Sequence, residues 1–252
     1  MTGPMYALAL RDAAPMPYQD FSDLEIAALE TALRISWLEA KAAQTEFGVD
    51  FSTCNEEEIS SVLFEVMAVL ANRSAGPLKG LLDHFDVPTA EATLRSFADP
   101  RPPTVRGAGT TLSKRRPDFA FRRKRTPEGV SKPYCAAFVE AKILEPGKTF
   151  RWYTYTGLLR FVTGAYASSM AQGLLLGYVR GDVPLALPSN LNKYLSRTKV
   201  SLELKVKHLA KLCPFSKDII YLHNSVHDRA WLYEGTKQAP GAVKVFHLWL
   251  HV

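Results

Sequence analysis

Apolar residues recur at helical spacing through the first third of the chain. One stripe lies between residues 22 and 47, and Ser22 with Glu25 three positions later has the pattern of a capping box at its start. Its apolar positions are Leu24, Ala28, Leu29, Ala32, Leu33, Ile35 and Leu38. A second helix is predicted after Asn55, which is a suitable N-cap. The stripe of that helix contains Ile59, Val62, Leu63, Val66, Val69 and Leu70.

The pattern then changes from helical to extended. Two short helices are expected over KGLLDHF and TAEATLRSF, before a stretch rich in proline and glycine interrupts the periodicity. From about Leu112 onward, RRPDFAFRRK and YCAAFVEAKIL predict two strands of a hairpin. A helix from Trp152 to Met170 and a buried strand over QGLLLGYVRG are expected next. IIYLHNSV and VKVFHLWLHV predict further strands, whereas the basic stretch 187–212 is ambiguous.

This order of elements predicts an α/β fold. We expect a mixed central sheet of four or five strands flanked by helices, with an N-terminal helical portion that covers one side or contacts a partner. The boundary is placed at residue 50, so that 1–50 form an arm and a helix, and 51–252 form the core. At 252 residues and 47% apolar composition, the chain has enough material for such a core.

Charge and cysteine content narrow the choice of partner and compartment. The formal charge of +6, from 31 Lys and Arg against 25 acidic residues, favours a polyanionic partner. Cys54, Cys135 and Cys213 are odd in number and lack metal-ligand spacing, so we expect neither a disulfide framework nor a zinc site. No segment has the length needed to cross a bilayer, and the N-terminus lacks a signal-peptide pattern. The expected protein is soluble, cytoplasmic and free of membrane contact.

The chemistry is concentrated on the predicted hairpin. Asp118 follows Pro117 on its first strand, and Glu140 and Lys142 lie on the second. Side chains two positions apart on a strand share a face, so Glu140 and Lys142 project together, and Asp118 joins them if the strands pair around the loop. Two carboxylates beside an ammonium suit phosphodiester hydrolysis, because carboxylate oxygens hold Mg²⁺ and a lysine orients the attacking water. Charges in an otherwise apolar strand also need a partner or a metal.

These residues resemble the PD-(D/E)xK, or restriction-endonuclease-like, nuclease superfamily. The resemblance covers roughly residues 55–180: an acidic helix, the hairpin with P-D and E-x-K, then a helix and a strand. It implies a PD-(D/E)xK-like nuclease core over 51–252 and Mg²⁺ as cofactor, with Mn²⁺ as a substitute. It also implies a further metal-binding glutamate on the preceding helix, for which Glu58 is the candidate and Glu65 the second choice. The spacing after the catalytic strand differs from that of one exonuclease branch, which favours an endonuclease.

Residues around the hairpin are candidates for nucleic-acid contact. The resemblance implies that Tyr155 or Arg160 on the following helix contacts the scissile phosphate. A basic run can neutralise several phosphates; its members are Lys114, Arg115, Arg116, Arg122, Arg123, Lys124 and Arg125. A second set extends the track and comprises Lys193, Arg197, Lys199, Lys205, Lys207 and Lys211.

Each of these assignments has a structural alternative. Glu58 is at the third position after Asn55, where it can complete a capping box instead of holding a metal. The basic run can be a soluble hairpin tip that discourages edge pairing. The bulky aromatic residues are expected in the core instead of on a base-stacking surface; these are Trp152, Phe161, Trp231 and Trp249.

The resulting hypothesis is a metal-dependent DNA endonuclease. Asp118, Glu140 and Glu58 hold Mg²⁺, and Lys142 serves the attacking water. Restriction or bacteriophage defence is a role associated with the fold alone. The alternative is a non-catalytic nucleic-acid-binding or assembly module, and RNA is a second candidate substrate. A homodimer, or a partner protein in a larger complex, is compatible with either hypothesis.

Overall fold

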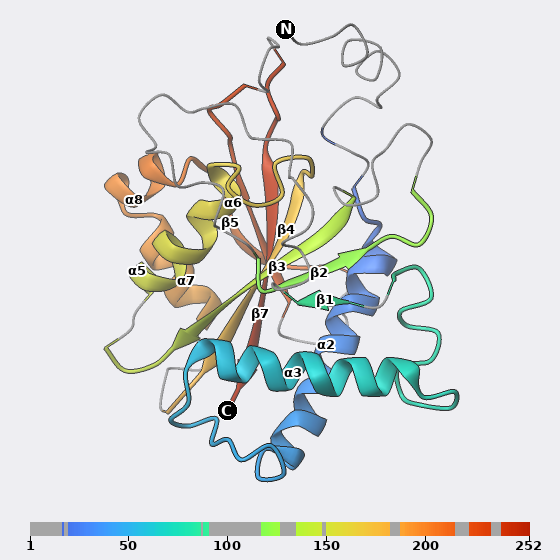
Figure 1. Ribbon diagram of the computed structural model, residues 1–252. Helices are drawn as coiled ribbons and strands as arrows, with labels where there is room; N and C mark the ends of the chain where they lie inside the picture. Colours follow the sequence, from blue (N-terminus) through green and yellow to red (C-terminus); the bar gives the residue numbers. More distant parts are fainter. Residues whose placement is uncertain are drawn as a thin grey trace, which may run out of the picture.

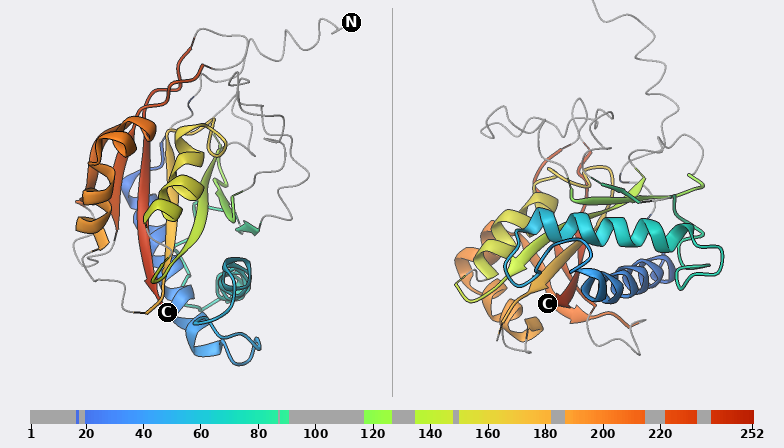
Figure 2. Two further views of the ribbon diagram at one scale, coloured as in Figure 1. Left: turned by 90° about the vertical axis from the view of Figure 1, so that its left-hand side faces the viewer. Right: turned by 60° about the horizontal axis from the view of Figure 1, so that its bottom comes forward.

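The protein is a mixed β-sheet with helices on both faces (Figure 1). The computed structural model describes residue 17 and residues 20–86, 88–90, 117–126, 135–147, 150–181, 187–214, 222–232 and 238–252. Two long helices come first: α2 (Asp23–Ala43) and α3 (Glu56–Asn72). The later helical elements are α5 (Phe150–Trp152), the π-helix η3 (Tyr153–Leu158), α6 (Leu159–Val162), α7 (Leu187–Leu195) and α8 (Thr198–Glu203). The helices lie in two layers against the sheet (Figure 2).

The sheet has seven strands in the order β1-β2-β3-β4-β7-β6-β5. Their bounds are β1 (Thr89–Ala90), β2 (Phe119–Arg122), β3 (Ala136–Leu144), β4 (Gln172–Val179), β5 (Val206–Leu212), β6 (His223–His227) and β7 (Val243–His251). The three central strands β3, β4 and β7 are parallel, and the strands on each side pair antiparallel. The α/β class and the mixed sheet are as predicted, but the expected number of four or five strands was too low.

The two N-terminal helices begin where capping chemistry predicts. Ser22 and Glu25 form a reciprocal capping box at the start of α2, and Asn55 and Glu58 form another at the start of α3. The apolar face of α3 is buried against the sheet, where the Ser60 hydroxyl lies 3.1 Å from the Tyr178 hydroxyl of β4. This contact fixes α3 across the end of the strands that carry the candidate site.

Three of the shorter predictions were wrong within the described residues. The stretch 79–85, predicted as a helix, consists of turns up to residue 84, with Gly80 at a positive φ of 84°, and Phe85 forms a β-bridge with Arg123. Thr89 and Ala90, the first residues of the other short predicted helix, form β1, and residues 91–97 lie outside the described part of the chain. The helix predicted to reach Met170 ends at Val162, because Gly164 adopts the left-handed conformation, with a φ of 72°, that commonly terminates a helix.

A continuous apolar core joins the N-terminal helix to the rest of the protein. It contains residues of α2 and α3 together with all the central strands, on both sides of the boundary proposed at residue 50. Trp37 of α2 stacks on Tyr178, and its indole N–H donates to the backbone oxygen of His251 at 3.0 Å. Helix α2 is therefore part of the same packed unit. Among the described helices, none combines the length and apolarity that crossing a membrane requires.

Candidate active site

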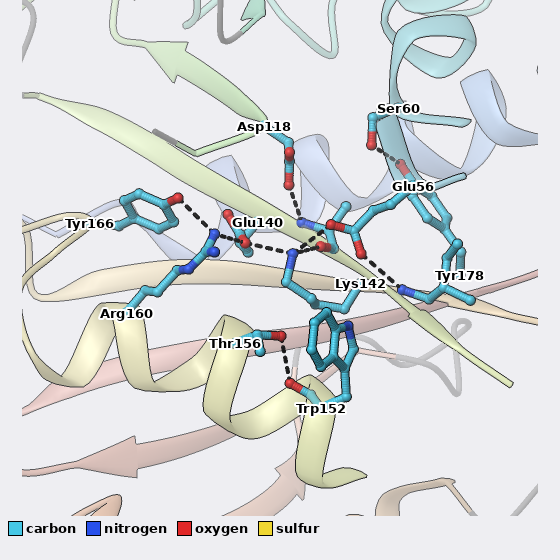
Figure 3. A network of polar contacts seen from close by, with 12 residues as sticks. Glu56, Ser60, Asp118, Glu140, Lys142, Trp152, Thr156, Arg160, Tyr166 and Tyr178 are labelled. Carbon is cyan, nitrogen blue, oxygen red and sulfur yellow. Dashed lines mark hydrogen bonds and ion pairs between the residues drawn. The ribbon is translucent and has the colours of Figure 1, made fainter. Parts of the chain in front are cut away.

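Asp118, Glu140 and Lys142 meet on one face of the sheet, as predicted (Figure 3). The register pairs Phe119 with Val139, so Asp118 lies opposite Glu140 on the neighbouring antiparallel strand. The Lys142 ammonium nitrogen is 2.7 Å from a carboxylate oxygen of Glu140. Asp118 Oδ2 accepts a hydrogen bond of 2.6 Å from the backbone N–H of Ala141, the residue between Glu140 and Lys142 in the sequence.

The acidic residue that reaches this site from α3 is Glu56, and not Glu58. Glu56 Oε1 is 2.6 Å from the Lys142 ammonium nitrogen, and its other oxygen accepts from the backbone N–H of Ile143 at 3.2 Å. Glu58 is exposed, and its carboxylate accepts a 2.7 Å hydrogen bond from the backbone N–H of Asn55 in the capping box. The assignment of Glu58 to the site is therefore corrected to Glu56, and Glu65 is also exposed.

The sequence contains a signal that identifies Glu56. It precedes the buried residues Ile59, Ser60 and Leu63 by three, four and seven positions, so it continues the buried stripe of α3. Glu58, two positions later, is rotated about 200° around a helix of 3.6 residues per turn and faces away. We name Asp118, Glu140, Lys142 and Glu56 the carboxylate–lysine cluster.

The cluster forms where β2 no longer covers the edge of β3. Pairing with β2 covers residues 136–139 of β3, which leaves the next backbone N–H groups on that edge without a strand partner. Buried N–H groups require acceptors. The carboxylates of Asp118 and Glu56 supply them at Ala141 and Ile143, respectively. The two carboxylates therefore have a structural task as well as the chemistry proposed for them.

Arg160 of α6 enters the cluster from the helical side. Its guanidinium nitrogen Nη1 donates to Glu140 Oε1 and, at 2.8 Å, to the hydroxyl of Tyr166. The Arg160 side chain retains 28% exposure, whereas that of Glu140 is 1% exposed. Arg160 is thus the cation of the site that solvent and a substrate can still reach. Tyr155 points elsewhere, because its hydroxyl donates to Glu203 of α8.

A glycine allows the helical segment to approach the lysine closely. A Cβ atom added to Gly157 of η3 would lie 3.2 Å from Lys142 Cγ and 2.8 Å from a methyl carbon of Leu175. Single-turn π-helices are frequent at functional sites. Here the π-helix brings the small residue over the lysine stem, so that the segment 150–162 forms one wall of the cluster.

Asp118 and Glu140 are buried in an environment that disfavours the ionised form of a carboxyl group. Burial and the nearby Asp118 together raise the pKa of Glu140 to about 8, against the opposing effects of Lys142 and Arg160. Burial likewise raises the pKa of Asp118 to about 6. Burial alone would lower the pKa of Lys142, but the combined attraction of Glu140, Glu56 and Asp118 raises it. When Asp118, Glu140 and Glu56 are all ionised, their three negative charges exceed the two positive charges of Lys142 and Arg160.

The donor set fits a small hard cation such as Mg²⁺. Within the described segments, no group of three or more His, Cys, Asp or Glu residues is arranged as a metal site. Mg²⁺ does not require one, since it is usually held by one or two carboxylates together with waters and substrate phosphates. Asp118 and Glu140 supply two carboxylates, and Glu140 Oε2 is buried with no hydrogen-bond partner among the described residues. An unpartnered buried oxygen of this kind is available to a metal ion.

Among the described residues, the predicted basic run is divided between buried and exposed side chains. Arg115 and Arg116 lie outside the described residues. The prediction for Arg123 was wrong in its orientation: the side chain is 9% exposed, donates to both carboxylate oxygens of Glu25, and lies 4.2 Å from the Phe21 ring centroid. It therefore joins α2 to β2. Arg122 is half-buried, and Lys124 is exposed.

The second basic set is exposed along α7, α8 and β5. Strand β5 lies at the far edge of the sheet, separated from β3 by β4, β7 and β6. Among the described residues, the part of the second set on β5 therefore has three strands between it and the strand that carries Glu140 and Lys142.

One aromatic prediction is also corrected. Phe161, Trp231 and Trp249 are buried as expected, but Trp152 is 48% exposed. It is the last residue of α5 and lies at the rim of the cluster (Figure 3). Its helical position predicted a place on an apolar face, but its indole lies beside Lys142 and remains half exposed (Figure 3).

Comparisons of the chain with protein-family models, with curated proteins and with solved structures each found no match.

Proposed function

We propose that the protein is a Mg²⁺-dependent nuclease that cleaves phosphodiester bonds in DNA. The proposal depends on one observation: Asp118, Glu140 and Lys142 converge, and a buried oxygen of Glu140 has no hydrogen-bond partner among the described residues. The order of elements also supports a restriction-endonuclease-like fold, since α3, the antiparallel pair β2–β3, the helical segment 150–162 and the parallel strand β4 follow one another.

Each residue of the cluster has a task in this proposal. Asp118 and Glu140 would hold the metal ion, which polarises the phosphate and lowers the pKa of a bound water. Lys142 positions the attacking water or neutralises charge on the phosphate. Glu56 holds the Lys142 ammonium in place through their 2.6 Å contact. Arg160, partly exposed beside Glu140, binds a non-bridging oxygen of the scissile phosphate.

Conversion of supercoiled plasmid to nicked or linear DNA tests the proposal. Cleavage is expected with Mg²⁺ or Mn²⁺ and should stop when a chelator is added. Asp118→Asn keeps an oxygen that can accept from Ala141, and Lys142→Met keeps the buried stem, so both variants should fold. Each is expected to lose at least about a hundred-fold in rate, the usual scale for a positioned catalytic group. Lys79→Met, at an exposed turn, is the matched control.

The same assay decides between DNA and RNA. Labelled DNA and RNA of one sequence, digested in parallel, should show faster hydrolysis of DNA. Faster hydrolysis of RNA would change the substrate but leave the metal chemistry intact. Full cleavage by both Asp118→Asn and Lys142→Met would remove the catalytic proposal.

A second candidate is a nucleic-acid-binding or assembly module that does not cleave. It is favoured by the structural use of the cluster: Asp118 and Glu56 satisfy the exposed edge of β3, and Lys142 and Arg160 already neutralise Glu140. This candidate predicts plasmid binding without nicking at any concentration of Mg²⁺ or Mn²⁺.

A further inference from the structure

Trp152 is the exposed tryptophan of the protein. Of the four tryptophans, Trp37, Trp231 and Trp249 are buried, whereas Trp152 is 48% exposed. Burial of a large apolar side chain stabilises a fold, so an aromatic ring left exposed beside a polar site is more informative than one in the core. The backbone at Trp152 is held by a 2.7 Å hydrogen bond that its oxygen accepts from the Thr156 hydroxyl.

The indole borders a surface hollow of about 690 Å³. This volume is within the range of small-molecule sites, roughly 300–1,000 Å³. Glu56 and Ile143, which also contact each other in the carboxylate–lysine cluster, line the same hollow. A ligand in the hollow would therefore lie directly beside the residues proposed to cleave the phosphodiester bond; Figure 3 shows Trp152 and Glu56 next to Lys142.

The charges of the hollow do not suit a phosphate. Its arginine, Arg180, is engaged by the backbone oxygens of Phe51 and Cys54 and by the Glu145 carboxylate. The remaining charged residues in its lining, Glu56 and Glu57, are acidic. Acidic groups repel phosphate but accept hydrogen bonds from N–H donors. An uncharged aromatic ring that carries N–H groups suits the hollow, because the ring can stack on Trp152 and the N–H groups can donate to the acidic side chains.

We propose that this hollow binds one unpaired nucleobase next to the scissile phosphate, and that the base stacks on Trp152. The inference rests on the nuclease function proposed above. The bases of a duplex are paired and stacked, so only an unpaired nucleotide can enter. The preferred substrates are then single strands, or duplexes with a bulge or flap at the cleavage position. Adenine, cytosine and guanine, which carry amino groups, bind better than thymine or uracil.

Cleavage of matched oligonucleotides tests this proposal. The substrates are a fully paired DNA duplex, the same duplex with one unpaired adenosine, and that bulged duplex with an abasic site in place of the adenosine. The wild-type protein should cleave the bulged duplex fastest and lose about ten-fold in kcat/KM on the abasic version, the order expected for one base–aromatic stack. Trp152→Ala should lose about ten-fold on the bulged duplex and be insensitive to the abasic site.

Two further variants separate stacking from general effects. Trp152→Phe keeps an aromatic face and should retain most of the preference. Leu38→Ala removes another exposed apolar side chain, on α2, and should behave as wild type. Equal preference for the bulged duplex in wild type and Trp152→Ala would overturn the subsite, even if both proteins cleave DNA.

Fluorescence distinguishes failure of the subsite from failure of the nuclease. In the presence of a chelator, a single-stranded adenosine trinucleotide should quench the emission of the wild-type protein, and Trp152→Phe should abolish that change. Quenching in a protein that cleaves no substrate would support the base subsite and contradict the nuclease function. Metal-dependent cleavage without quenching would support the nuclease and overturn the subsite.

Discussion

The free energy of unfolding of Glu140→Gln, measured relative to that of wild type, should increase as the pH rises. The Glu140 carboxyl is buried, and its pKa in the folded protein is about 8, against an ordinary value of 4.5. A carboxyl whose pKa is raised by folding binds its proton more tightly in the folded state. The contribution of Glu140 to the free energy of unfolding is therefore fully present below about pH 4.5 and is lost as the pH rises to about 8. Gln has no proton to lose, so this decrease is absent.

The size of the effect follows from the same pKa. Each factor of ten in a proton equilibrium corresponds to about 1.4 kcal/mol. For Glu140, the part that develops between pH 5 and pH 8 is on the order of 3 kcal/mol. The attraction of Lys142 and Arg160 for the ionised carboxylate is already contained in the pKa of about 8, so it needs no separate correction. The change in the difference between wild type and variant therefore isolates the ionisation of Glu140.

Urea unfolding at pH 5 and pH 8, without metal, measures this change. The free energy of unfolding of Glu140→Gln minus that of wild type should increase by about 3 kcal/mol from pH 5 to pH 8. Glu65→Gln, at an exposed position of α3, should show no such increase. The same difference at both pH values for Glu140→Gln would show that the Glu140 carboxyl is not held in an unfavourable environment.

Three further predictions concern the cluster. Because its two buried carboxylates hold protons up to about pH 6 and about pH 8, Mg²⁺ binding measured by calorimetry should tighten from pH 6 to pH 8 and release protons; equal affinity at both pH values contradicts this. Glu56→Gln should lower the plasmid cleavage rate about ten-fold by loosening Lys142, whereas Glu58→Gln, which preserves a capping box, should not; the reverse ranking would restore Glu58 to the site. Gly157→Ala should reduce kcat about ten-fold while the protein stays folded by circular dichroism, since the added methyl displaces Lys142; an unchanged kcat would show that this close approach has no role.

Local sequence patterns predicted the elements that carry the cluster. The capping boxes at Ser22 and Asn55 fixed the starts of both long helices, because the cap and the residue three positions later satisfy each other. The two-residue period of a strand placed Glu140 and Lys142 on one face. These features depend on neighbours in the sequence, and so they can be inferred without the tertiary structure.

The errors occurred where distant residues decide the structure. The short strand β1 exists through its pairing with β2, and β5 has little alternation because most of its residues are exposed at the sheet edge. Arg123 lies in a basic run, yet its role is set by Glu25, 98 positions earlier in the chain. The choice of Glu58 over Glu56 was different, since the buried stripe of α3 already favours Glu56.

The cleavage rate of supercoiled plasmid by wild type and Glu140→Gln, at one Mg²⁺ concentration and with Glu65→Gln as control, tests the central claim most directly. If Glu140 holds the catalytic metal, wild type and the control nick the plasmid at similar rates and Glu140→Gln falls by at least about a hundred-fold. Equal rates for wild type and Glu140→Gln, or nicking that persists after chelation, would contradict a metal-dependent active site at this cluster.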